Sequence, residues 1–75
     1  MELVYDLHGI FLEDLDQLFD KYIYNAYLSG NDSIKFITGS GKLQKRIIEL
    51  CKLYYSFSYY IPMHNHGEIV VLLDL

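Results

Sequence analysis

The chain has 75 residues, which suffice for a single domain over residues 1–75 and leave no room for a second. Its composition, 52% hydrophobic and 16% aromatic, supplies a core and excludes the intrinsically disordered class. The formal net charge of -4 argues against strong, indiscriminate binding to nucleic acid. The charge is uneven, because residues 1–34 are acidic and residues 35–75 are mildly basic.

No apolar run approaches the roughly 20 residues of a membrane span, and no basic segment followed by an apolar one opens the sequence. We therefore expect a cytoplasmic protein with no membrane partner. The lone cysteine, Cys51, cannot form an internal disulfide, which fits a reducing compartment. Its apolar neighbours at helical spacing favour a place in the core over a role as a nucleophile.

The first half of the chain predicts a strand followed by an amphipathic helix. Residues 2–8 alternate in character, which is typical of a strand with two different faces: Leu3, Tyr5 and Leu7 on one, Val4, Asp6 and His8 on the other. From Leu12 to Leu28 the pattern becomes helical, and Gly30 is well placed to end that helix. Its predicted apolar stripe consists of Leu12, Leu15, Leu18, Phe19, Tyr22 and Ala26.

The second half predicts another strand and helix and then a hairpin. Residues 33–38 have the composition of a short strand, and residues 42–53 repeat apolar side chains at helical spacing. Strand-forming residue types follow over 55–61 until Pro62, and residues 63–68 form a turn. The final run, 69–75, is apolar on both faces, so we place that strand in the middle of the sheet.

This order of elements predicts a two-layer α/β domain of the type βαβαββ. A right-handed crossover makes the first two strands parallel and brings their carboxyl ends to one edge of the sheet. Ligands of open α/β sheets bind beyond that edge. The loops found there are DLHG (6–9) and TGSG (38–41), and we expect the functional site where they meet.

These motifs resemble those of the Smr domain, the small module at the carboxyl end of MutS2 proteins and in some plant pentatricopeptide-repeat proteins. The family opens on a strand ending in Leu-Asp-Leu-His-Gly, here YDLHG (5–9). It then has a strand leading into His-Gly-x-Gly or Thr-Gly-x-Gly, here TGSG (38–41). A basic helix follows, and then a hairpin whose last strand begins after a glycine, here GEIVVLL (67–73). The resemblance covers essentially the whole chain.

The resemblance implies a fold like the C-terminal domain of translation initiation factor 3, with two helices on one face of a mixed four-stranded sheet. It also implies nucleic-acid binding and, in several family members, endonuclease activity on RNA or DNA. Thr38 stands where many relatives have histidine.

The TGSG loop has the features of a phosphate site. Its glycines allow a tight turn that exposes backbone N–H groups at the start of a helix, where the helix dipole favours an anion. An ordinary glycine-rich turn with a solvated basic face is the alternative. It is not a Walker A loop, which needs a glycine where this chain has Phe36. The residues predicted to contact phosphate are Thr38, Gly39, Ser40, Gly41, Lys42, Lys45 and Arg46.

Asp6 and His8 are the candidate catalytic residues, since side chains two apart on a strand project to the same side. A carboxylate beside an imidazole can orient it as a general base for water or a ribose 2′-hydroxyl. Asp6 is also a candidate ligand for a divalent metal, although the sequence does not show whether a cofactor is needed. In the structural alternative, Asp6 caps the following loop and His8 bonds to the backbone.

Two further features favour simpler interpretations. The letters HNH at 64–66 do not reproduce the nuclease of that name, whose residues are spread over a longer ββα unit, and a His-x-His metal pair lacks an evident third ligand. The eight tyrosines could stack on unpaired bases, but strand and core positions explain them better.

The sequence thus predicts a small domain that binds nucleic acid through its two loops, with endonuclease activity on RNA or DNA as the enzymatic alternative. A different alternative is a protein-interaction module on ribosomes or a repair complex. In that case the acidic first helix, with Glu13, Asp16 and Asp20, forms the contact face.

Overall fold

The computed structural model describes residues 3–39 and 41–73, and it contains the predicted elements in the predicted order. Their bounds are β1 (Leu3–Asp6), α1 (Leu12–Leu28), β2 (Ser33–Ile37), α2 (Lys42–Leu50), a π-helical turn η1 (Cys51–Tyr55), β3 (Ser58–Tyr60) and β4 (Glu68–Leu72). None of the helices among the described residues combines the length and the apolar character that a bilayer span requires.

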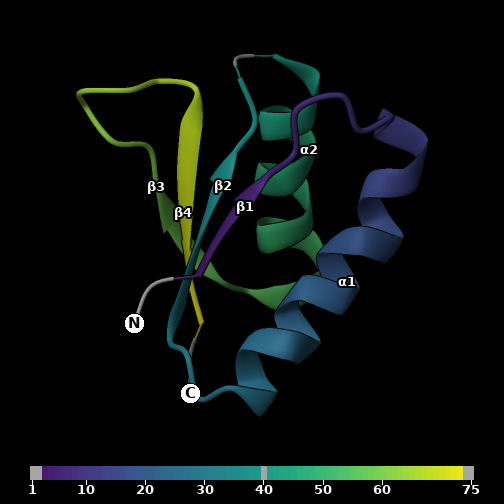
Figure 1. Ribbon diagram of the computed structural model, residues 1–75, viewed down its shortest axis with the longest axis vertical. Coiled ribbons are helices and arrows are strands. Elements are labelled where there is room, and N and C mark those ends of the chain that lie inside the picture. The colour runs from purple at the N-terminus through teal and green to yellow at the C-terminus, as the bar shows by residue number, and fades with distance from the viewer. Residues whose placement is uncertain (1–2, 40, 74–75) are drawn as a thin grey trace.

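The four strands form one mixed sheet in the order β1-β2-β4-β3 (Figure 1). β1 and β2 are parallel, as predicted, whereas β4 runs antiparallel to both of its neighbours, β2 and β3. The prediction that the last strand lies inside the sheet is confirmed. Its apolar residues explain this position, since Ile69 and Val71 join the core and Val70, which points to the other face, is only 2% exposed.

Both helices pack on the same face of the sheet, so the fold has two layers (Figure 1). The core between them contains Leu15, Phe19, Ile34, Phe36 and Ile47, all fully buried. The stripe predicted for α1 was nearly correct, but three positions differ. Leu12 is 44% exposed because it is the first residue of the helix and lies beyond the core, and Leu18 is only partly buried and does not join the core, while the unpredicted Ile23 is buried.

The helix predicted over residues 42–53 is regular only to Leu50 and then widens into the π turn η1. The N–H of Ser56 donates to the carbonyl of Cys51, five residues back, and Ser56 then takes a left-handed conformation with φ 56°. Because this turn uses residues up to Tyr55, β3 is shorter than the predicted 55–61.

Half of the tyrosines are partly buried and pack against the core, in line with the core and strand positions that the sequence favoured. The ring of Tyr5 stacks on that of Tyr22 with 3.9 Å between centroids, and Tyr55 and Tyr59 also pack against the core. Cys51 has no exposed surface, and burial raises the pKa of its thiol to about 11. A thiol this difficult to ionise is a poor nucleophile, which agrees with the core position predicted for Cys51.

Candidate nucleic-acid interface

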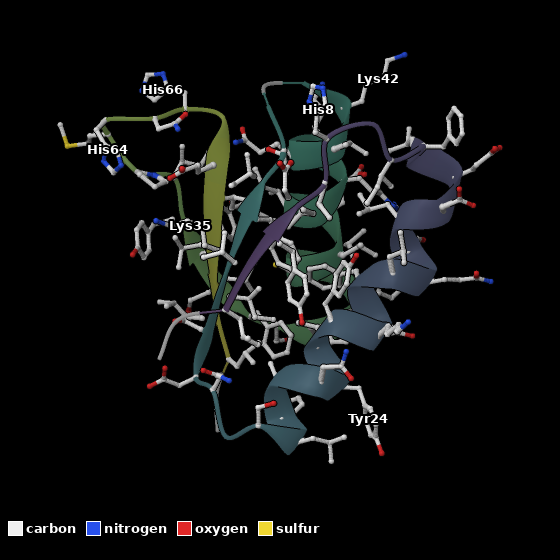
Figure 2. All side chains as sticks on the ribbon, in the orientation of Figure 1. His8, Tyr24, Lys35, Lys42, His64 and His66 are labelled. Carbon is white, nitrogen blue, oxygen red and sulfur yellow. The ribbon has the colours of Figure 1, made fainter. Side chains whose placement is uncertain are left out.

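The two predicted loops meet at one end of the sheet because β1 and β2 are parallel and in register. Asp6 pairs with Ile37 as the last residue of each strand, and the N–H of Leu7 donates to the carbonyl of Ile37 at 2.9 Å. In Figure 2 the side chains of His8 and Lys42 therefore lie at the same end of the molecule. The sequence prediction that the two motifs converge agrees with this geometry.

Asp6 holds the first loop in shape. Its Oδ1 accepts a hydrogen bond from the backbone N–H of His8 at 2.9 Å, and the N–H of Ile10 donates to the carbonyl of Leu7 at 3.1 Å. Gly9 completes the turn at φ 83°, a conformation that L side chains rarely adopt. The carboxylate thus contacts the backbone of His8 rather than its ring, as in the capping alternative. The imidazole is exposed and has no hydrogen bond within the described residues.

The second loop is fastened to the start of β4 through one carbonyl. The carbonyl oxygen of Gly67 accepts hydrogen bonds from the N–H groups of Thr38 (2.8 Å) and Gly39 (3.0 Å). The hydroxyl of Thr38, a residue only 8% exposed, lies 2.6 Å from the carbonyl of Gly39 and 3.2 Å from that of Gly67. These two amides are used inside the protein and are not free to bind an anion. Ser40 lies outside the described residues.

Gly67 and Gln44 support this loop, and sequence reasoning did not identify them as site residues. A Cβ on Gly67 would lie 3.3 Å from the Cα of Gly39, so the close approach of the two segments favours glycine at this position. Nε2 of Gln44 donates to the carbonyls of His66 (2.8 Å) and Glu68 (3.3 Å), which ties α2 to the same segment. The only sequence feature that pointed to this support was Gly67 itself, the glycine that precedes the last strand in the family pattern.

The N-terminus of α2 is the part of the loop region that remains open to an anion. Gly41 precedes it with φ 107°, no side chain among the described residues caps it, and its first turn has no acidic residue. The first N–H groups of a helix lack partners within the helix, and the dipole places partial positive charge there. Lys42 and Lys45, both exposed, add full charges.

Arg46 has a different environment from the two lysines. Its guanidinium bonds in a bidentate manner to Asp16 of α1, with Nε–Oδ1 3.0 Å and Nη2–Oδ2 2.7 Å, and it also bonds to Glu49 at 3.3 Å. The bond from Arg46 lowers the pKa of the Asp16 carboxyl below its ordinary value of 3.8. Arg46 therefore links the two helices, and its role as a phosphate ligand stays a prediction.

The hairpin loop between β3 and β4 reaches the same end of the molecule and contains the histidines of the HNH sequence (Figure 2). His64 Nε2 lies 4.0 Å from Glu68 Oε1, and the loop is braced by Asn65, whose Oδ1 accepts the N–H of Gly67 at 2.9 Å. Within residues 3–39 and 41–73, no three histidine, cysteine or carboxylate side chains group as metal ligands.

Comparison with known proteins adds to this description. The family model described as the Smr domain matches residues 5–73, which include both loops. The crystal structure of the Smr domain of Thermus thermophilus MutS2 has a TM-score of 0.86 at 23% sequence identity, covering 97% of this chain and 99% of that one. No match was found among curated proteins. At this identity the likeness to the MutS2 domain shows a shared fold.

Proposed function

Since this chain belongs to the Smr domain family, we propose that it binds nucleic acid at the end of the sheet where the DLHG and TGSG loops meet. The observation that carries the proposal is the start of α2, which has no acidic residue in its first turn and no side-chain cap from residues 3–39 or 41–73. Exposed Lys42 and Lys45 lie on this helix, and exposed His8 lies at the same end (Figure 2). This combination suits the oxygens of a phosphodiester.

The residues of the two loops divide into ligands and supports. The N–H groups at Gly41 and the first turn of α2 bind the phosphate, while Lys42 and Lys45 contact it or its neighbours. Thr38 and Gly39 fix the loop through Gly67, and Ser40 belongs to the same predicted site. Arg46 contributes by holding α2 against α1.

A site with two lysines on a chain of net charge -4 gives modest binding that depends on salt. Each neutralised phosphate contributes about 0.7–0.9 to the slope of log affinity against log salt. We expect a slope of roughly 1.4–1.8 from the two lysines on that basis. A flat salt dependence would contradict a phosphate site.

Cleavage of the bound strand is the second candidate, and exposed His8 favours it. With Asp6 bonded to its backbone N–H, the imidazole is carried by a fixed loop at the end where phosphate would bind. An imidazole in that place can remove a proton from water or from a ribose 2′-hydroxyl. A divalent metal would have Asp6 as its first candidate ligand.

The test measures binding and cleavage together. Fluorescently labelled single-stranded, hairpin and duplex RNA and DNA are titrated by anisotropy at several salt concentrations and incubated with and without Mg²⁺ or Mn²⁺. The variant with Lys42→Ala and Lys45→Ala should bind at least about tenfold more weakly and lose most of the salt slope. The matched control removes two lysines elsewhere, Lys21→Ala and Lys52→Ala.

His8→Ala separates the two functions. If the natural chain cuts and His8→Ala binds without cutting, the loops form a nuclease centre. If neither the natural chain nor His8→Ala cuts, and only the variant with Lys42→Ala and Lys45→Ala loses binding, the chain binds nucleic acid without cleaving it. Equal losses in the Lys21 and Lys52 control would refute the site and leave only a diffuse charge effect.

A further inference from the structure

The helical layer has two hollows that share one side chain, Asp20. The first, of about 270 Å³, lies between α1 and the end of α2 and is lined by Asp16, Asp20, Leu50, Tyr54 and Tyr55. The second, of about 500 Å³, runs along α1 and is lined by Asp20, Lys21, Ile23, Tyr24 and Tyr27. Asp20 borders both hollows, so they are neighbours on α1, and together they are called here the helix groove.

The carboxylates of the helix groove have different partners. Asp16 is held by the guanidinium of Arg46 at 2.7 Å and 3.0 Å. Asp20, one helical turn further on, is exposed and has no hydrogen bond or ion pair within the described residues. The pair at Asp16 shows that a guanidinium can meet a carboxylate of α1 in bidentate geometry. The same geometry is open to an incoming cation at Asp20.

Exposed tyrosines line both of the hollows that Asp20 borders. Tyr54 is 68% exposed and Tyr24 is 63% exposed, and they border the two hollows on either side of Asp20. The π turn η1 brings both Tyr54 and Tyr55 to the rim, and such turns often occur at functional sites. The face of a tyrosine ring attracts a cation, and its area buries apolar groups. A carboxylate between exposed tyrosines suits a cationic side chain with apolar neighbours.

The charge of α1 excludes nucleic acid as the occupant. Glu13, Asp14, Asp16 and Asp20 lie on this helix against Lys21 alone, so a phosphate backbone would be repelled. The end of the groove at Tyr24 is also remote from the loops, since Tyr24 lies at the opposite end of the molecule from His8 and Lys42 (Figure 2).

We propose that the helix groove binds a segment of a partner protein in which an arginine is flanked by apolar residues. The guanidinium pairs with Asp20 and lies on the ring of Tyr54, while an apolar neighbour covers Tyr24 and Tyr27. The Smr-type loops stay free, so the domain can hold a protein and a nucleic acid at the same time. This inference does not depend on the nucleic-acid proposal.

The test uses a defined probe, the acetylated and amidated peptide Gly-Leu-Arg-Leu-Gly, and a matched peptide with citrulline in place of arginine. Citrulline has the same shape without the charge. Each is titrated into the ¹⁵N-labelled chain and followed by amide chemical shifts. The arginine peptide should shift the amides of Asp20, Tyr24 and Tyr54 but not that of Lys42.

Two variants make the result decisive. Asp20→Asn should weaken binding of the arginine peptide at least about fivefold, because it removes the charge from the hydrogen bond. Asp14→Asn, an equal loss of charge on the same helix outside the groove, should leave binding unchanged within about twofold. Equal binding of the citrulline peptide, equal losses in both variants, shifts centred on Lys42 or no binding at millimolar peptide would each overturn the proposal.

Discussion

Asp6 illustrates how a single side chain in a motif can have a role that its neighbours in the sequence do not reveal. The strand pattern placed Asp6 and His8 on the same side, which suggested a carboxylate orienting an imidazole. The chain turns at Leu7–Gly9 instead, and Oδ1 of Asp6 accepts the N–H of His8. The carboxylate therefore fixes the loop, and the imidazole depends on it only indirectly.

This role predicts different results for two substitutions of Asp6. Asp6→Asn keeps an acceptor oxygen for the N–H of His8 and should leave the free energy of unfolding almost unchanged. Asp6→Ala removes the acceptor and should cost about 0.5–1.5 kcal/mol. Urea unfolding followed by circular dichroism measures both. Equal losses would show that the charge of Asp6, rather than its hydrogen bond, stabilises the loop.

Among the secondary-structure elements, the contact between α1 and α2 depends on an ion pair as well as on the core. Arg46 bonds to Asp16 thirty residues earlier in the chain, and the ion pair lies at the surface with Asp16 half exposed. Exposed ion pairs contribute little to stability unless their geometry is good. The bidentate geometry here makes a measurable effect reasonable, and its dependence on pH identifies it.

The sign of that dependence follows from Asp16. Its pKa is lower in the folded chain than its ordinary value of 3.8, so the folded state favours the ionised carboxylate. The stabilisation is complete above the unfolded pKa and is lost as the pH falls through the lower folded pKa. The melting temperature of the natural chain should therefore be a few degrees higher than that of Asp16→Asn at pH 6, and this difference should disappear towards about pH 2.

Glu49→Gln provides the control for this pair, because Glu49 makes only one bond to Arg46, at 3.3 Å. Its effect on the melting temperature should be smaller at every pH. A gap between the natural chain and Asp16→Asn that stays constant down to pH 2 would contradict the ion-pair explanation.

At the scale of the whole molecule, stability rests on one small core organised around Phe36. The ring of Phe36 lies 5.6 Å from that of Phe19 and 6.0 Å from those of Tyr5 and Tyr22, measured between centroids. A domain of this size has a free energy of unfolding of roughly 4–11 kcal/mol. One large side chain thus represents a substantial share of the total.

Phe36→Ala should remove a large share of the stability, since such truncations cost about 3–5 kcal/mol. We expect this variant to be largely unfolded near 37 °C, whereas Phe36→Leu, which keeps most of the volume, should fold with a lower melting temperature. Circular dichroism melts of the two variants decide the point. A cooperative melt of Phe36→Ala within a few degrees of the natural chain would show that the core does not depend on this ring.

The fold was predicted well because it depends on the spacing of apolar residues within each element and on the order of the strands and helices along the chain. Alternation in residues 2–8 and the two-sided apolar run ending the chain were enough to place strands and faces. The site was predicted only in part, because its details arise from contacts distant in sequence. No local pattern shows that the Gly39 amide is taken by Gly67, or that Arg46 is paired with Asp16.

The central position of β4 has a consequence for how the chain folds. β3 pairs only with β4 in this sheet, and β2 joins β3 only through β4. Until residues 68–72 are available, the segment 58–60 has no strand partner and β2 has one unpaired edge. Sheets closed by such distant pairings form slowly and cooperatively. Synthesis of the first 60 residues therefore cannot yield a stable half-sheet, and folding waits for the strand that is made last among these four.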